Sequence, residues 1–336
     1  MAPRPDLPVL TRGGAALAAL RAAPRSPAAG VERRPAASRV EPPPTVPLLA
    51  LDELWFQVSG TVCNLRCRHC FISCAPDNHS HWFMSREAVR SYLEESRGLG
   101  VKEYYFTGGE PFMNREIEGI LQDTLELGSA TVLTNGTLIP PRRAEALAGL
   151  AGASPYSLEL RVSLDGVTAS MNDAIRGEGT FNRCMDGVRQ LVAAGFLPII
   201  SCMRSWPEPE TEEVLGAFRE LLAGVGYTRP RLKILPPLLM GEEESRTRGY
   251  EDTEFVSHDM MYGFDSGQLL CSRARLVTAR GVQACPILLE SPAARLGDTL
   301  GEAVGRDAPL ADAACFTCYQ NGAICSNAPS GSGLDR

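Results

Sequence analysis

The chain has 336 residues, a formal net charge of −7 and a hydrophobic content of 44%, which is enough apolar side chain for a large buried core. The acidic balance argues against nucleic acid as the main partner, because a phosphate-binding surface needs clustered Lys and Arg. No run of eighteen apolar residues occurs, so the sequence predicts no membrane-spanning helix and no membrane partner.

Residues 1–48 differ in composition from the rest of the chain, since they are rich in Ala, Pro and Arg. Such a segment predicts a disordered arm. Its nearest approach to a signal-peptide core is GGAALAAL at 13–20, which is short, made of small residues and followed at once by Arg21. We therefore expect a cytoplasmic protein whose cysteines stay reduced.

Three cysteines follow the first predicted strand, WFQVSG at 55–60. Cys63, Cys67 and Cys70 stand in one short loop with the spacing C-x3-C-x2-C. Three soft thiolates are the ligands that select an iron-sulfur cluster or zinc, and three ligands on a four-iron cluster leave one iron open. Cys74 could close a structural zinc site, so zinc remains an alternative.

Short β-branched or aromatic runs alternate with helical patterns from Leu54 onward, which is typical of βα units around a parallel sheet. Helices are predicted over 85–100 and 181–195, and each ends at a Gly. The predicted strands cover 55–60, 103–108, 130–136, 158–165, 197–203 and 229–236. Six such units predict an α/β fold of the partial (β/α)6 barrel type.

Polar and glycine-rich turns follow the predicted strands. The second strand runs into TGGEP at 107–111, the third into TNG with Asn135, and the fourth into SLDG at 163–166. Because residues at the carboxyl ends of parallel strands share one rim, we expect these turns and the cysteine loop to meet there.

The pattern changes after about residue 240, which divides the chain into a core at 49–240 and a small cysteine-rich module at 241–330. The module contains a predicted hairpin at 275–287. It is too small for much of a core, so we expect a metal to hold it together. Its cysteines follow the spacings C-x9-G-x3-C and C-x2-C-x6-C and are Cys271, Cys285, Cys315, Cys318 and Cys325.

CNLRCRHC followed by TGGEP and SLDG resembles the radical S-adenosylmethionine (SAM) superfamily over about residues 54–240. The resemblance implies a barrel of the radical SAM type in which Cys63, Cys67 and Cys70 hold a 4Fe-4S cluster that binds SAM. An electron from an external donor such as flavodoxin or ferredoxin then yields a 5'-deoxyadenosyl radical, which abstracts hydrogen from the substrate. His69 stands where the family usually has Tyr or Phe, as a flat ring beside the cluster or adenine.

The resemblance and the chemistry together imply a SAM-binding set on the rim. The two glycines let the backbone approach the methionine end of SAM, the Glu accepts from its ammonium group, and the Pro stiffens the turn. Two strand-end residues match family contacts to the ribose or the substrate, and an Arg matches the partner of the SAM carboxylate. The set comprises Gly108, Gly109, Glu110, Pro111, Asn135, Ser163, Asp165 and Arg176.

The second cysteine set resembles the SPASM or shorter twitch extension, which binds auxiliary 4Fe-4S clusters in part of the superfamily. One auxiliary cluster fits better than two, and zinc with the same ligands is the alternative. Its expected ligands are Cys271, Cys285, Cys315 and Cys318, with Cys325 as the substitute.

Three functions follow from this interpretation. The first is a radical SAM enzyme that oxidises or epimerises a small molecule such as a sugar or cyclitol intermediate. An epimerase needs a hydrogen donor, and Cys202 at the end of the fifth strand is the candidate, with an unligated Cys325 as another. The second is a peptide-modifying maturase, and the third a non-catalytic iron-sulfur scaffold or electron carrier.

Overall fold

The computed structural model describes residues 41–327, so most of the predicted arm lies outside the described residues. Residues 41–48 were expected to belong to that arm, but they are part of the fold. Strand β1 (Thr45–Val46) pairs antiparallel with β11 (Ala308–Pro309), and Val46 is fully buried. The arm boundary at residue 48 is therefore corrected, because this short pairing with a distant strand leaves no trace in a Pro-rich composition.

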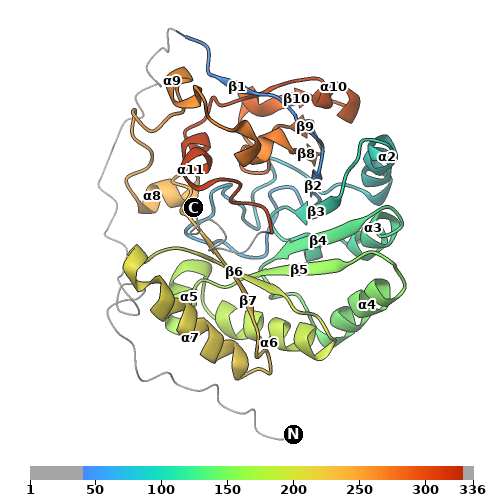
Figure 1. The fold of residues 1–336 in the computed structure, drawn as a ribbon. Helices are drawn as coiled ribbons and strands as arrows, with labels where there is room; N and C mark the ends of the chain where they lie inside the picture. Colours follow the sequence, from blue (N-terminus) through green and yellow to red (C-terminus); the bar gives the residue numbers. More distant parts are fainter. Residues whose placement is uncertain (1–40, 328–336) are drawn as a thin grey trace, which may run out of the picture.

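Six parallel strands form the centre of the main sheet and follow one another in chain order (Figure 1). They are β2 (Glu53–Gln57), β3 (Glu103–Thr107), β4 (Ser129–Thr134), β5 (Leu158–Ser163), β6 (Ile199–Met203) and β7 (Arg231–Leu235). Each coincides with one of the six predicted strands. The α/β class is confirmed, and the six parallel strands match the six predicted βα units.

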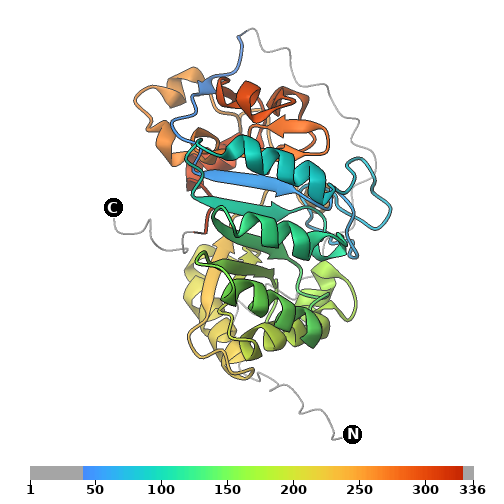
Figure 2. The ribbon, with the colours of Figure 1, turned by 90° about the vertical axis from the view of Figure 1, so that its right-hand side faces the viewer.

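Helices on the outer side of the sheet bury one face of these strands (Figures 1 and 2). Helix α2 begins after Ser85, whose side chain accepts the N–H of Ala88, and it buries Val89 and Leu93. The larger helices are α2 (Arg86–Ser96), α3 (Ile117–Thr124), α4 (Pro141–Gly152), α5 (Ala169–Arg176), α6 (Thr180–Ala193) and α7 (Thr211–Ala223). Throughout residues 41–327, every helix is too short or too polar to cross a membrane.

Alternation along the strands decides which side chains face the inside of the sheet. On β2, Leu54 and Phe56 pack under the helices, whereas Trp55 belongs to a separate inner cluster with Tyr105 of β3. The two inner rings are stacked with their centroids 4.1 Å apart. The inner side is therefore lined by every second strand residue.

The C-terminal region continues the same sheet beyond β2. Strand β8 (Ala274–Thr278) pairs parallel with β2, and β9 (Gly281–Gln283) and β10 (Arg295–Gly297) follow antiparallel. The predicted hairpin is thus β8 and β9, and the nine-stranded sheet joins the module to the core. Its helices are α8 (Glu242–Arg246), α9 (His258–Met261), α10 (Leu300–Val304) and α11 (Ala314–Asn321).

Candidate functional site

An open cavity of about 1270 Å³, counted with the space open to solvent, lies at the carboxyl ends of the parallel strands. Most of the predicted rim residues line it, as expected for side chains that follow successive parallel strands. Those residues are Cys63, Cys67, Cys70, Gly108, Gly109, Asn135, Ser163, Asp165 and Arg176. The structure therefore brings the cysteine loop and three of the predicted turns together around one cavity.

The cysteine loop is held by backbone hydrogen bonds from both sides. The N–H of Cys63 donates to the carbonyl oxygen of Ala75 over 3.2 Å, which closes the loop on itself. The carbonyl oxygen of Cys70 accepts from the N–H of Glu242 over 3.0 Å, so the chain after β7 braces the loop. Cys63 and Cys67 are buried, and no cysteine forms a disulfide. The loop is thus positioned by residues from distant parts of the chain.

Burial controls the thiols of this loop. It raises the pKa of Cys63 to about 12 and that of Cys67 to about 11. Cys70 differs, because hydrogen bonding from Cys74 lowers its pKa, and the N–H of Cys74 also donates to its sulfur over 3.2 Å. Since thiolates are the metal ligands, binding of a cluster here must release protons.

The two glycines of TGGEP are required by close packing against the cysteine loop. A Cβ on Gly108 would overlap the Ser59 side chain, and one on Gly109 would overlap the Val62 carbonyl group. Gly108 also has a φ of 144°, which L-residues with side chains rarely adopt. The glycines therefore let the turn after β3 touch the loop after β2.

Glu110 is not among the residues that line the cavity, and its contact with the SAM ammonium group stays a prediction. Its side chain is fully buried and accepts hydrogen bonds from the N–H of Asn135 (2.8 Å), the hydroxyl of Thr134 (2.8 Å) and the N–H of Phe112 (3.1 Å). Burial raises its pKa. Glu110 thus joins the ends of β3 and β4, and Pro111 is likewise buried, at the start of the short helix η1 (Pro111–Met113).

Asp165 is the centre of a buried ionic group at the rim. One carboxylate oxygen lies 2.6 Å from Nε2 of His69 and 2.6 Å from Nε of Arg176, and the other accepts the N–H of Met203 over 2.8 Å. Burial alone would raise the pKa of Asp165, but the charges of Arg176 and His69 hold it below its usual range. The predicted ring of His69 thus orients a carboxylate, a role that its place in the CRHC motif did not indicate.

Asn135 connects the end of β4 to the cysteine loop. Its side-chain N–H donates to Oδ1 of Asn64 over 2.8 Å, and its Oδ1 accepts the N–H of Thr137 over 2.9 Å. The same amide nitrogen lies 3.8 Å from the Cys63 sulfur. Asn135 therefore contacts the Cys63 sulfur as well as lining the cavity.

The floor of the cavity contains residues that the motifs did not indicate. Arg161 of β5 is 3% exposed and donates through Nη1 to the carbonyl oxygen of Cys325 over 2.7 Å. Trp55, Ile324 and Cys325 line the same floor. The one signal in the sequence was alternation, because Arg161 stands two residues before Ser163 in LELRVSLD and so faces the same side.

Cys202 lies on the opposite side of its strand from the cavity, which corrects its expected role as a hydrogen donor. Ser201 and Met203 line the cavity, whereas Cys202 packs in the main hydrophobic core and is 3% exposed. The physical reason is the alternation of side chains along β6. Burial raises the pKa of Cys202.

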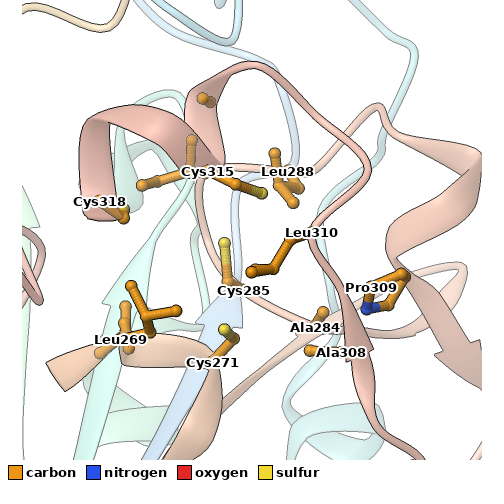
Figure 3. Close-up of a pocket in the computed structure, with 13 residues that line it drawn as sticks. Leu269, Cys271, Ala284, Cys285, Leu288, Ala308, Pro309, Leu310, Cys315 and Cys318 are labelled. Carbon is orange, nitrogen blue, oxygen red and sulfur yellow. The ribbon is translucent and has the colours of Figure 1, made fainter. Parts of the chain in front are cut away.

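A second, apolar cavity lies in the C-terminal module and is lined by four further cysteines (Figure 3). It measures about 450 Å³, counted with the space open to solvent, and is walled by side chains such as Leu269, Leu288 and Leu310. Burial raises the pKa of each of its four thiols. They belong to Cys271, Cys285, Cys315 and Cys318, whereas Cys325 lines the first cavity.

The cysteines of each set are spread around a cavity. Within residues 41–327, no three His, Cys, Asp or Glu side chains converge closely enough to share one metal ion. In a four-iron cluster each thiolate binds its own iron, so the thiols surround a volume instead of a point. Both cysteine sets line such a volume.

Comparison with known proteins adds a family and several relatives. Residues 58–222 match the Radical SAM superfamily. Over 135 residues the chain is 33% identical to the mycofactocin maturase MftC of Mycobacterium tuberculosis, which covers 40% of this chain and 33% of that protein. Over 194 residues it is 30% identical to an AdoMet-dependent heme synthase of Methanosarcina barkeri, which covers 56% of this chain and 52% of that protein.

The fold is similar to that of solved structures. The crystal structure of SuiB of Streptococcus suis bound to the precursor peptide SuiA aligns with a TM-score of 0.57 and 17% identity, covering 77% of this chain and 64% of that one. At this identity the likeness concerns the fold alone. The matched segments span about a third of MftC and half of the heme synthase.

Proposed function

Since residues 58–222 form a radical SAM domain, we propose that this enzyme generates a 5'-deoxyadenosyl radical in the larger cavity and uses it to abstract hydrogen from a peptide. The observation that carries the proposal is the meeting of Cys63, Cys67 and Cys70 with the TGGEP and SLDG turns around that cavity. A 4Fe-4S cluster supplies the electron that cleaves SAM when both are bound.

The residues of this chain have separate tasks in that reaction. The three thiolates would hold the cluster, while Asn135 orients Cys63. Asp165 fixes Arg176, whose guanidinium is suited to the SAM carboxylate. Gly108 and Gly109 have no side chains, so SAM can approach the backbone closely there. The floor, lined by Trp55 and Ile324, limits access of water to the radical.

A peptide is the proposed substrate because MftC is a maturase and SuiB is bound to a precursor peptide. Part of the cavity is open to solvent, which gives a substrate a route to the rim. A small molecule, the expectation from the sequence, is the second candidate, and the match to a heme synthase over 56% of this chain favours it.

The second cavity is the proposed site of one auxiliary 4Fe-4S cluster with four protein ligands. Cys271, Cys285, Cys315 and Cys318 share that cavity, and Cys325 does not line it. A cluster saturated by four thiolates would have no iron free for substrate, so its role would be to stabilise the module or to accept an electron from the substrate radical. A flavodoxin or ferredoxin is the proposed donor to the first cluster.

Anaerobic reconstitution with SAM and dithionite tests the reaction, and the expected product is 5'-deoxyadenosine. The Cys67→Ala variant is the control and should give none. For the substrate class, we would add extracts of cells grown in deuterated medium, split by size and with or without protease digestion. Deuterium in 5'-deoxyadenosine should depend on the undigested peptide fraction. Transfer from the small-molecule fraction, insensitive to protease, would favour the second candidate.

A further inference from the structure

Arg161 is a buried cation that faces the reaction cavity without an anionic partner. Its side chain lines the cavity and its residue is 3% exposed. In the described part of the chain, its Nε is buried and has no hydrogen-bond partner, and the acceptor of its Nη1 is a neutral carbonyl group, that of Cys325. A buried guanidinium in this state is costly unless something supplies negative charge.

The surroundings of Arg161 increase this need. Lys233 is a second buried cation, 6% exposed, and burial together with the charge of Arg161 lowers the pKa of Lys233 to about 8. Glu53 is the nearby carboxyl group, but burial raises its pKa to about 7, and it accepts a hydrogen bond from the Trp55 indole instead of forming an ion pair with Arg161. Among the described residues, no carboxylate therefore forms an ion pair with Arg161.

The position of Arg161 separates it from the residues assigned to SAM. It precedes Ser163 by two residues on β5, which places it about 6–7 Å deeper than the rim. Asp165 and Arg176, the proposed partners of SAM, lie beyond Ser163 on the rim side. Ser163 lies between the two levels, and its hydroxyl oxygen is 3.5 Å from that of Ser201 on the neighbouring strand.

We propose that Arg161 binds a carboxylate carried by the substrate, so that the enzyme selects a peptide with an acidic group near the site of hydrogen abstraction. That the substrate is a peptide rests on the proposed function. The binding of a carboxylate by Arg161 does not depend on turnover. The apolar lining of the cavity, which includes Leu133 beside Arg161 on the neighbouring strand as well as Ile72 and Leu235, accommodates the uncharged part of the ligand.

The test is calorimetric titration of the anaerobic holoenzyme with two probes, acetyl-glutamate amide and acetyl-glutamine amide, at equal ionic strength. The probes differ by one charge, so their ratio of affinities isolates the carboxylate. We expect the wild type to prefer the acidic probe at least tenfold, and Arg161→Gln to abolish the preference. Arg90→Gln is the matched control, because Arg90 is exposed on α2 and pairs with Asp123. It should keep the preference.

Three outcomes would overturn the inference: no preference in the wild type, an unchanged preference in Arg161→Gln, or loss of the preference when SAM is saturating, which would place the carboxylate in the SAM site. If Arg161→Gln does not fold, Arg161→Lys decides, since a lysine lacks the planar fork and should bind the acidic probe several-fold less tightly with no change for the neutral one. If Arg161→Lys bound the acidic probe as tightly as the wild type does, that result would contradict the inference. Failure of the holoenzyme to form 5'-deoxyadenosine would refute the proposed function while leaving the titration interpretable.

Discussion

At the scale of single residues, four thiols lie on one loop but only three are expected to be essential. Cys74 lines the cavity beside Cys63, Cys67 and Cys70, and a substitution removes its side-chain hydrogen bond with Cys70 but preserves the one from its backbone N–H. Cys63→Ala, Cys67→Ala and Cys70→Ala should each abolish SAM cleavage, whereas Cys74→Ala should retain most of it. The measurement is 5'-deoxyadenosine formed per iron. Abolition in a folded Cys74→Ala protein would mean that the fourth thiol takes part.

The ionic group around Asp165 makes a second prediction. Asp165→Asn leaves the buried guanidinium of Arg176 without its counter-charge, which should lower the free energy of unfolding by about 3–5 kcal/mol. Asp77→Asn is the control, since Asp77 pairs with Arg66 on the surface and should change little. Anaerobic urea titrations measure both. Equal losses in the two variants would show that the Asp165 group is not a strong buried pair.

The raised pKa of Glu53 predicts that the free energy of unfolding depends on pH. Burial raises its folded-state pKa from 4.5 to about 7, so its protonated form is favoured in the folded protein. The corresponding stability is fully present below pH 4.5 and is lost as the pH rises through 7. Between pH 6 and pH 8 the wild type should lose about 1 kcal/mol of unfolding free energy that Glu53→Gln does not lose. Parallel pH profiles of the two proteins would contradict this.

At the scale of elements, β6 shows that a shift of one residue along a strand decides whether a side chain faces the cavity or the core. Cys202 packs in the core between Ser201 and Met203, which face the cavity. Cys202→Ala should therefore lower the free energy of unfolding by about 1 kcal/mol and leave substrate conversion intact. Product analysis by mass spectrometry checks it. Loss of product with unchanged formation of 5'-deoxyadenosine would restore Cys202 as a hydrogen donor.

The same scale explains what the sequence could predict. The six strands and the cysteine loop were predictable because they depend on local patterns, namely β-branched runs and fixed cysteine spacing. The burial of Glu110 was not, since it depends on Thr134 and Asn135 of another strand end. The pairing of β8 with β2 was also hidden, because a parallel partner two hundred residues away leaves no local signal.

At the scale of the whole molecule, two separate cavities are lined by cysteines, one at the carboxyl ends of the parallel strands and one in the C-terminal module. We therefore predict two clusters that can be removed independently of each other. A variant with Cys63, Cys67 and Cys70 all changed to Ala should keep about one 4Fe-4S cluster, because the cavity of the C-terminal module is untouched. Iron and sulfide counts with Mössbauer spectra measure it. A further Cys285→Ala change should remove the remaining cluster. A triple variant empty of iron, or holding zinc, would be evidence against an auxiliary cluster.

The contacts at the floor of the reaction cavity bear on the order in which parts of the protein fold. Arg161 is tied to Cys325, 164 residues later, and Glu103 accepts from Asn327, 224 residues later. Contacts of such long sequence separation form late in folding. During synthesis on the ribosome, the six strands can therefore assemble while the cavity is still open below. The floor of the cavity is complete only when residues 324–327 have joined the fold, because their contacts with Arg161 and Glu103 close it from below.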